Sequence, residues 1–233
     1  ALVAAEFAVN RAGVIAVNQS NAALISARTA ATDAINAVAA AVKTTINDLS
    51  PLSDRQTRLD QVATDIANAQ TALASTSATA DVTAAQGKAI ATLNADAANA
   101  QQKSSQEDAI SRLRNYATNA ETAIAALPGL SADNLATAKT AIESAVTNGD
   151  TNIQGASEHA AMASALIAAE QVIDTATTTA QNQSQQTLSL AQSNAAAAID
   201  AALAAAEQKL NNLSLSTTDQ AAQEKQLAAD AGN

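Results

Sequence analysis

Three short turn motifs recur along the 233-residue chain and divide it into long repeats. The motifs occupy residues 49–53, 127–131 and 213–216, and each begins with a leucine and ends with a serine. Both prolines of the chain, Pro51 and Pro128, lie in these motifs, and the third motif follows the second at a slightly longer interval than the second follows the first. A long internal period indicates a chain built from copies of one supersecondary unit.

The residues before each motif predict a helix with one narrow apolar face. Counting back from the leading leucine, positions 3, 7 and 14 carry the same kind of residue in all three repeats. Because these offsets combine steps of three and four, the side chains share one face of a helix, as in coiled coils. The residues are Ile46, Ile124 and Leu210 at position 3; Val42, Ala120 and Ala206 at position 7; and Ile35, Leu113 and Ile199 at position 14.

The last serine of each motif is predicted to cap the helix that follows. These serines are Ser53, Ser131 and Ser216, and an aspartate follows each within three residues. A serine oxygen accepts a hydrogen bond from a free N–H of the first turn, and a carboxylate suits the positive end of the helix. Ser53 and Gln56 also have the spacing of a capping box.

The composition favours a few long helices over any fold that contains a sheet. Alanine is the commonest residue by a wide margin, whereas Leu, Ile, Val and Phe together are too few for an ordinary globular core. Alanine is the strongest helix former, and its methyl group can be buried where helices approach closely. Six Gly and two Pro leave few helix breakers. The sequence therefore predicts a thin, all-helical fold.

Two polar stretches, residues 94–109 and 174–187, contain no large apolar side chain and could be either helix or flexible linker. Because they are rich in Ala and Gln and lack Gly and Pro, we expect continuous helix, with Thr177–Thr179 as the place where a break would occur if there were one. Breaks are expected instead at residues 75–77 and 148–150.

The predicted fold is thus all-α, an elongated array of linked up-down-up three-helix bundles that share long continuous helices. The predicted units are 1–93, with helices 3–49, 54–75 and 81–93; 94–173, with helices 94–127, 131–147 and 151–173; and a partial unit 174–233, with helices 174–213 and 217–231.

Three isolated glycines do not form a phosphate-binding loop. We interpret Gly149 as a turn residue within the break at 148–150. Gly87 and Gly155 are expected where helices approach closely.

Charge and residue usage exclude several partners and cofactors. The net charge is −10 with a pI near 4.4, and the basic residues are scattered singly, so nucleic-acid binding is not expected. The absence of cysteine excludes disulfides and thiolate metal sites. No apolar run approaches the roughly 20 residues that span a bilayer, so we expect no membrane insertion. The chain opens without a signal peptide and ends without a sorting signal, so we expect it to be a segment of a longer protein.

Catalytic and metal-binding chemistry finds little support in the sequence. His159 is the only histidine, and we interpret it as an exposed helix residue because no nucleophile lies at helical spacing from it. Glu107 and Asp108 are expected to diverge into solvent, Tyr116 to be half-buried packing, and Phe7 is a candidate binding anchor. Four aspartates lack the spacing of a calcium loop: Asp48, Asp54, Asp60 and Asp65. We therefore predict no enzyme, no catalytic, cofactor-binding or metal residue, and no cofactor.

The repeat resembles a known family of bacterial surface modules. The second unit carries the pattern Ile-x-x-Leu-Pro-Gly-Leu-Ser at 124–131, followed by Leu135, Ile142, Ala145, Gly149 and Ile153. The first unit matches through Leu49, Leu52, Leu59, Ile66, Ala69, Val82, Ala85, Gly87 and Ile90. Over most of the chain, as about two and a half units, this resembles the tandem three-helix repeats of giant Gram-positive cell-wall proteins. These are the extracellular-matrix-binding (Ebh-like) proteins, with their FIVAR, albumin-binding-type and related modules.

The resemblance implies a secreted, cell-wall-attached surface rod, sometimes with affinity for host matrix or serum proteins. We therefore expect a non-catalytic stalk segment of a bacterial adhesin, monomeric and with a net helical rise of about 150 Å, that projects a distal binding region. The alternative is a helical module that binds a host protein of the fibronectin or albumin type. A parallel coiled-coil oligomer is a third possibility, against which the turn motifs argue. The resemblance assigns no ligand-contacting residue to this chain.

Overall fold

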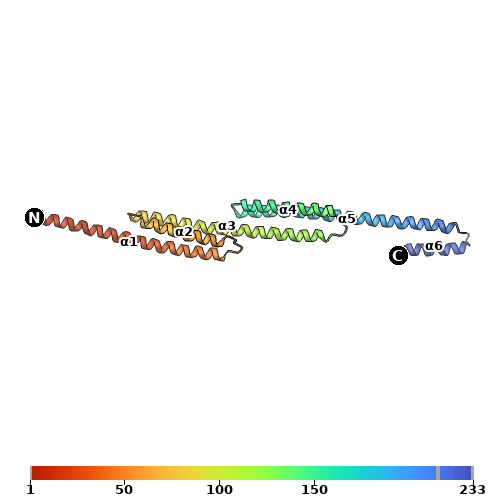
Figure 1. The fold of residues 1–233 in the computed structure, drawn as a ribbon, viewed down its shortest axis with the longest axis horizontal. Coiled ribbons are helices and arrows are strands. Elements are labelled where there is room, and N and C mark those ends of the chain that lie inside the picture. Colours follow the sequence, from red (N-terminus) through yellow and green to blue (C-terminus); the bar gives the residue numbers. More distant parts are fainter. Residues whose placement is uncertain (1, 214–215, 232–233) are drawn as a thin grey trace. The chain divides into compact units, whose positions relative to one another are not determined.

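The computed structural model describes residues 2–213 and 216–231, and these residues form six α-helices and no strand (Figure 1). The all-α prediction is confirmed. Long helices of 47, 47 and 53 residues alternate with short helices of 20, 24 and 15 residues. The helices are α1 (Leu2–Asp48), α2 (Arg55–Ala74), α3 (Thr79–Ala125), α4 (Ala132–Gly155), α5 (His159–Asn211) and α6 (Thr217–Ala231).

Both polar stretches are helical, as predicted. Residues 94–109 lie within α3 and residues 174–187 lie within α5. The threonine run does not break α5: Thr177 Oγ1 donates to the Ile173 carbonyl at 2.9 Å and Thr179 Oγ1 donates to the Thr175 carbonyl at 2.8 Å. These bonds satisfy the hydroxyls within the helix itself.

Two of the three predicted serine caps are present. Ser131 Oγ accepts a hydrogen bond of 3.2 Å from the Asn134 N–H at the start of α4. At the start of α6, Ser216 Oγ accepts a bond of 3.3 Å from the Asp219 N–H. Both bonds satisfy an N–H of the first helical turn, which has no partner within the helix.

The predicted cap and capping box at Ser53 are wrong. Helix α2 begins at Arg55 with Asp54 at the N-cap, and Asp54 makes no side-chain capping bond. The carboxylate of Asp54 instead accepts a bond of 2.9 Å from Arg58, and Gln56 donates to Asp60. The Asp54 carboxylate therefore bonds a side chain one turn later and caps no N–H of the first turn.

The predicted helix break at residues 148–150 is also wrong, because α4 continues to Gly155. Gly149 is a packing position and not a turn: a Cβ there would overlap Leu113 Cδ2 and lie 2.8 Å from Ala169 Cβ. By contrast, a Cβ at Gly87 or Gly155 would meet nothing within 4 Å, so the close helix approach predicted for these two glycines is wrong. The close approach is found at Gly149.

The chain divides into two compact units. The first contains Ala1–Arg112 and Asp150–Leu166, and the second contains Leu113–Gly149 and Ile167–Asn233. One cluster of buried residues in the first unit draws on α1, α2 and α3: Ala31, Ile35, Ala39, Val42, Ile46, Leu52, Val62, Ala69, Leu73, Val82, Leu93 and Ala100. Buried apolar residues of the second unit are Leu113, Ala117, Ile124, Ala138, Ile142, Ala145, Ala169, Ile173 and Ala180.

The predicted apolar face is buried in the first repeat, buried except for the half-buried Ala120 in the second, and open in the third. Ile46 and Ile124, three positions before their motifs, are 0% and 1% exposed. The equivalent residue of the third repeat, Leu210, is only half-buried. Fourteen positions before the motifs, Ile35 and Leu113 are 1% and 0% exposed, whereas Ile199 is 51% exposed.

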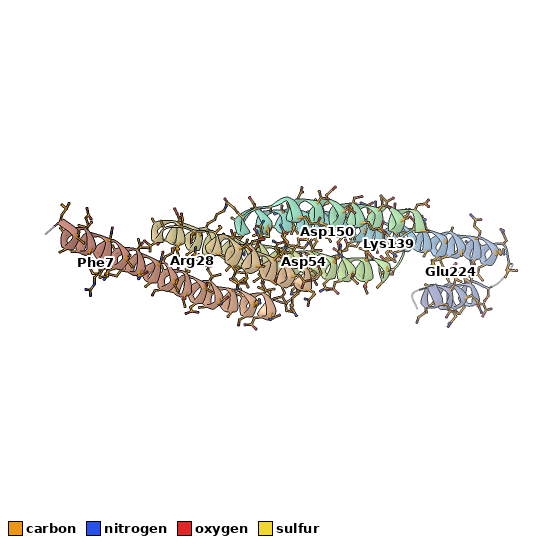
Figure 2. The ribbon with its side chains drawn as sticks, turned by 60° about the vertical axis from the view of Figure 1, so that its left-hand side comes forward. Phe7, Arg28, Asp54, Lys139, Asp150 and Glu224 are labelled. Carbon is orange, nitrogen blue, oxygen red and sulfur yellow. The ribbon has the colours of Figure 1, made fainter. Side chains whose placement is uncertain are left out.

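The N-terminal part of α1 is likewise uncovered. Every residue from 2 to 23 is exposed, whereas the buried face of the same helix begins at Ala31. Phe7, predicted as a candidate anchor, is 70% exposed on this segment (Figure 2).

Candidate functional site

The described residues show their most specific polar chemistry where side chains of the long helices bind the turns between helices. Arg28 on α1 donates from Nε to Thr76 Oγ1 at 3.1 Å and from Nη2 to the Thr76 carbonyl, in the turn between α2 and α3. Gln106 on α3 donates from Nε2 to the Gln154 carbonyl at 3.0 Å, at the end of α4. Both contacts therefore satisfy carbonyls at the C-terminal end of a short helix, where they have no helical partner.

These two contacts occupy equivalent positions of the repeat. Donor and acceptor are 48 residues apart in both contacts. The offset from Arg28 to Gln106 is the same as the offset from Leu49 to Leu127, the leading leucines of the first two motifs. The internal repeat is thus a repeat of long-range contacts as well as of sequence.

A second glutamine reinforces the contact with the end of α4. Gln102 Nε2 donates to the Ala156 carbonyl at 3.0 Å, and Gln106 Nε2 reaches the same carbonyl at 3.1 Å. Gln106 is only 8% exposed, and neighbouring Ser104 is 6% exposed. The polar character of this part of α3 is therefore structural, because the turn that it contacts presents backbone groups that must be bonded.

A neighbouring face of the same α3 segment binds the turn between α1 and α2. Glu107 Oε2 accepts a bond of 2.9 Å from the Ser53 N–H, and Glu107 Oε1 accepts another from the Ser53 hydroxyl. Lys103, one turn earlier, lies 3.6 Å from the Glu107 carboxylate. The prediction that Glu107 and Asp108 both extend into solvent is wrong for Glu107, although Asp108 is exposed.

In the second compact unit, α5 binds the turn between α3 and α4. Ser184 is 3% exposed, and its hydroxyl donates to the Pro128 carbonyl at 2.6 Å. Gly129, the next residue, has a φ of +76°, which suits glycine and agrees with the predicted turn. The sequence predicted that these polar stretches are helical but not that they bind turns. The signal that could have revealed this role is the constant spacing between the polar residues and the turn motifs.

His159, the first residue of α5, is exposed, as predicted. Its Nε2 lies 3.1 Å from Ser105 Oγ, a neighbour that its local sequence does not reveal. The Ser105 hydroxyl donates to the Gln101 carbonyl at 3.0 Å, so in this geometry it accepts a hydrogen bond from the imidazole and does not donate one to it. Nucleophilic catalysis needs the reverse polarity, with the hydroxyl donating to the histidine.

Tyr116 is more exposed than predicted, at 37%. Its hydroxyl donates to Asp174 Oδ1 at 2.5 Å. This hydrogen bond raises the pKa of Tyr116, because it stabilises the neutral phenol, and desolvation and the negative charge of Asp174 act in the same direction. The phenol therefore links α3 to α5 at the surface of the second compact unit.

One carboxylate pair in the first compact unit is held unfavourably. Asp96 Oδ2 on α3 is buried, and no donor among the described residues reaches it. Burial raises the pKa of Asp96, and the negative charge of Asp65 on α2 raises it further, whereas the charge of Arg58 opposes them. Such a group is more stable in the folded chain when it carries its proton.

Replacing Asp96 with asparagine is expected to raise the melting temperature at pH 7. The amide removes the negative charge that burial and the Asp65 carboxylate disfavour. Because the folded pKa lies above the ordinary value of 3.8, the native chain gains stability as the pH falls through that folded pKa toward 3.8. The advantage of the Asp96→Asn variant should shrink over the same pH range, which thermal unfolding followed by circular dichroism measures.

The matched control for this prediction is Asp108→Asn, which removes an exposed carboxylate from the same helix. It should leave the melting temperature nearly unchanged both at pH 7 and in acid. An Asp96→Asn variant that is less stable than the native chain at pH 7, or whose advantage is the same in acid, would contradict the assignment.

Each compact unit has a shallow hollow on its surface. The first, of about 330 Å³, lies between α4 and α5 and is bordered by alanines and threonines, with Asn134 and Gln183 as its amides. The second, of about 320 Å³, lies beside His159 and is bordered by Asp108 and Arg112. The second hollow brings Ser105, His159 and Asp108 together, but the Ser105 hydroxyl donates to the Gln101 carbonyl and not to the imidazole, which is not the arrangement of a catalytic nucleophile.

Within residues 2–213 and 216–231, no three His, Cys, Asp or Glu side chains are grouped so that they could hold a metal ion. None of the helices in this part of the chain combines the length and hydropathy that a transmembrane segment requires. No family model, curated protein or solved structure matches the chain.

Proposed function

We propose that the chain is a non-catalytic stalk segment of a bacterial cell-surface adhesin, an array of linked three-helix bundles that spaces a distal binding region from the cell wall. The surface location and the adhesin context rest on the resemblance of the repeat to modules of Gram-positive cell-wall proteins. The mechanical role rests on the long helices. Each bundle would consist of the later part of one long helix, the short helix that follows, and the first part of the next long helix.

The observation that carries the proposal is the way α3 binds turns on two of its faces within a few residues. Glu107 bonds the turn that precedes α2, and Gln106 bonds the end of α4. Because α3 is one uninterrupted helix through this segment, consecutive bundles would share it without a flexible joint. A helix that two bundles share keeps them apart along its axis, which is what a spacer requires.

Solution scattering tests the proposal. If the long helices of 47, 47 and 53 residues advance along one axis and the short helices of 20, 24 and 15 residues return, the net rise is about 130 Å at about 1.5 Å per residue. A maximum dimension near or above this value is expected for the monomer in dilute solution. A value below about 90 Å would mean that the bundles fold back on one another, which a spacer cannot do.

A pull-down from plasma separates the stalk from the alternative binding module. Specific retention of a matrix or serum protein, lost when that protein is added in excess, would favour the binding module. The stalk predicts no specific retention.

A further inference from the structure

At the α5–α6 end of the second compact unit, apolar residues at the core positions of the repeat are not covered by other helices. Ile199, Leu203, Ala206 and Leu210 lie within a narrow face of α5, because their spacings of four, three and four residues keep them aligned. Beside them α6 returns along α5 in both views (Figures 1 and 2), and contributes the half-buried Leu227.

Comparison with the other repeats shows how much cover is missing. Leu113, equivalent to Ile199, is 0% exposed, whereas Ile199 is 51% exposed. Leu227 follows Ser216 at the same offset as Ile142 follows Ser131, and Ile142 is 0% exposed whereas Leu227 is half-buried. In the first compact unit, α1, α2 and α3 all contribute to the buried cluster, so the α5–α6 pair lacks the cover of one helix.

The N-terminal segment of α1 aligns with the helix that supplies this cover in the first unit. When the first repeat is aligned with the second on Leu49 and Leu127, residues 2–25 of α1 align with residues 80–103 of α3, which contribute to the buried cluster of the first unit. Ile15 then corresponds to Leu93, and Ala22 corresponds to Ala100. Leu93 is 1% exposed, but Ile15 is 46% exposed.

The two uncovered surfaces are complementary in the number of helices that each offers. One offers a single helix, and the other is a pair of helices that needs a third. The uncovered residues 2–23 of α1 carry one acidic and one basic side chain, whereas residues 185–211 and 217–230 of α5 and α6 carry five acidic and two basic ones. Two α5–α6 ends therefore repel each other, whereas the uncharged balance of the α1 segment opposes no contact with an α5–α6 end, which favours association between unlike ends.

We propose that the N-terminal segment of α1 of one copy packs on the α5–α6 pair of a second copy, so that the protein associates head to tail. The new contact continues the packing already present in the chain, with Ile15 in the place that Leu93 occupies in the first unit. This proposal replaces the expectation of a monomer and does not depend on a stalk function. A contact between two different surfaces is heterologous, so it forms open chains and not closed dimers.

Sedimentation velocity of the 233-residue chain tests the proposal over a range of concentrations from about 1 μM to about 1 mM. We expect the weight-average mass to rise with concentration and to pass the mass of a dimer without a plateau. Ile15→Asp and Ile199→Asp should each abolish this rise, since each places a charge in the proposed contact. Both residues are exposed in the single chain, so circular dichroism should show unchanged helix content.

Mixing the two variants distinguishes head-to-tail association from its symmetric alternatives. The Ile15→Asp chain keeps a functional α5–α6 pair and the Ile199→Asp chain keeps a functional α1, so an equimolar mixture should form one-to-one dimers and nothing larger. Association of either variant alone would indicate a symmetric contact and overturn the proposal. A chain that stays monomeric at all concentrations would also overturn it.

Val9→Asp and Leu190→Asp are the matched controls. Val9 and Leu190 are 70% and 62% exposed, and they lie about 120° and 180° around their helices from Ile15 and Ile199, respectively. Both controls should associate as the native chain does. Loss of association in a control would show that the contact does not use the faces proposed.

Discussion

Replacement of Ile124 with aspartate is expected to unfold the helices around it in the second compact unit while the buried cluster of the first unit persists. Ile124 is 1% exposed, and three positions before the second motif it occupies the same place as Ile46 in the first repeat. Loss of the side chain alone costs about 2–5 kcal/mol, and burial of a carboxylate adds several more. That sum is comparable to the entire stability of a small domain, about 5–15 kcal/mol.

Hydrogen exchange read by mass spectrometry measures this outcome for each unit. Peptides around Ile142 and Ile173 should lose protection in the Ile124→Asp variant, whereas peptides around Ile35 and Val62 should keep it. Ile167→Asp is the matched control, because Ile167 is 53% exposed in the same unit, and it should leave protection nearly unchanged. Simultaneous loss of protection in both units would show that they unfold as one cooperative body.

The helices and their apolar faces could be predicted from the sequence because both depend on local periodicity. Residues at 3, 7 and 14 positions before each motif share one helix face whatever packs against it, and the lack of Gly and Pro in 94–109 and 174–187 predicted continuous helices. In the first repeat, Ile46, Val42 and Ile35 are all buried, as that face requires. The failure in the third repeat is informative: Ile199 has the right position, but burial also needs a partner helix.

The errors arose where a distant residue decides the local structure. Asn-Gly-Asp at 148–150 has the composition of a helix stop, but α4 continues because Leu113 and Ala169 pack against the bare glycine and stabilise the helix there. Ser53 fits a helix cap, but Glu107, 54 residues away, accepts hydrogen bonds from its N–H and its hydroxyl. Neither partner can be found within a helical turn of the sequence, so local propensity alone could not identify it.

The contacts of Arg28 and Gln106 were within reach of sequence reasoning, although they were not predicted. Both residues lie in long helices, and each precedes the leading leucine of its motif, Leu49 or Leu127, by the same number of positions. Aligning the polar positions with the same offset as the apolar ones would have indicated that these two side chains make equivalent contacts in successive repeats. An apolar pattern predicts where helices pack, and a polar pattern in the same register predicts where turns are held.

Gly149→Ala is expected to destabilise the second compact unit, although alanine is the better helix former. At an unhindered helical site this substitution stabilises by about 1 kcal/mol. At Gly149 the new methyl group would overlap the side chain of Leu113, which is 0% exposed, and lie 2.8 Å from Ala169 Cβ, whose position is fixed by its backbone. Overpacking of this kind costs about 1–3 kcal/mol, and the helices must also separate, so we expect a net loss of about 1–2 kcal/mol.

Gly87→Ala is expected to stabilise the same chain. Gly87 is an interior residue of α3, and a Cβ there meets nothing within 4 Å, so the variant should gain about 1 kcal/mol. Urea unfolding with hydrogen exchange assigns each change to its unit, α4 and α5 for Gly149→Ala and the first part of α3 for Gly87→Ala. If both variants were stabilised equally, α4 could not be packed at Gly149 as closely as the positions of Leu113 and Ala169 require. Opposite signs from the same chemical change would locate a close helix contact of the second unit at the glycine that local sequence assigns to a turn.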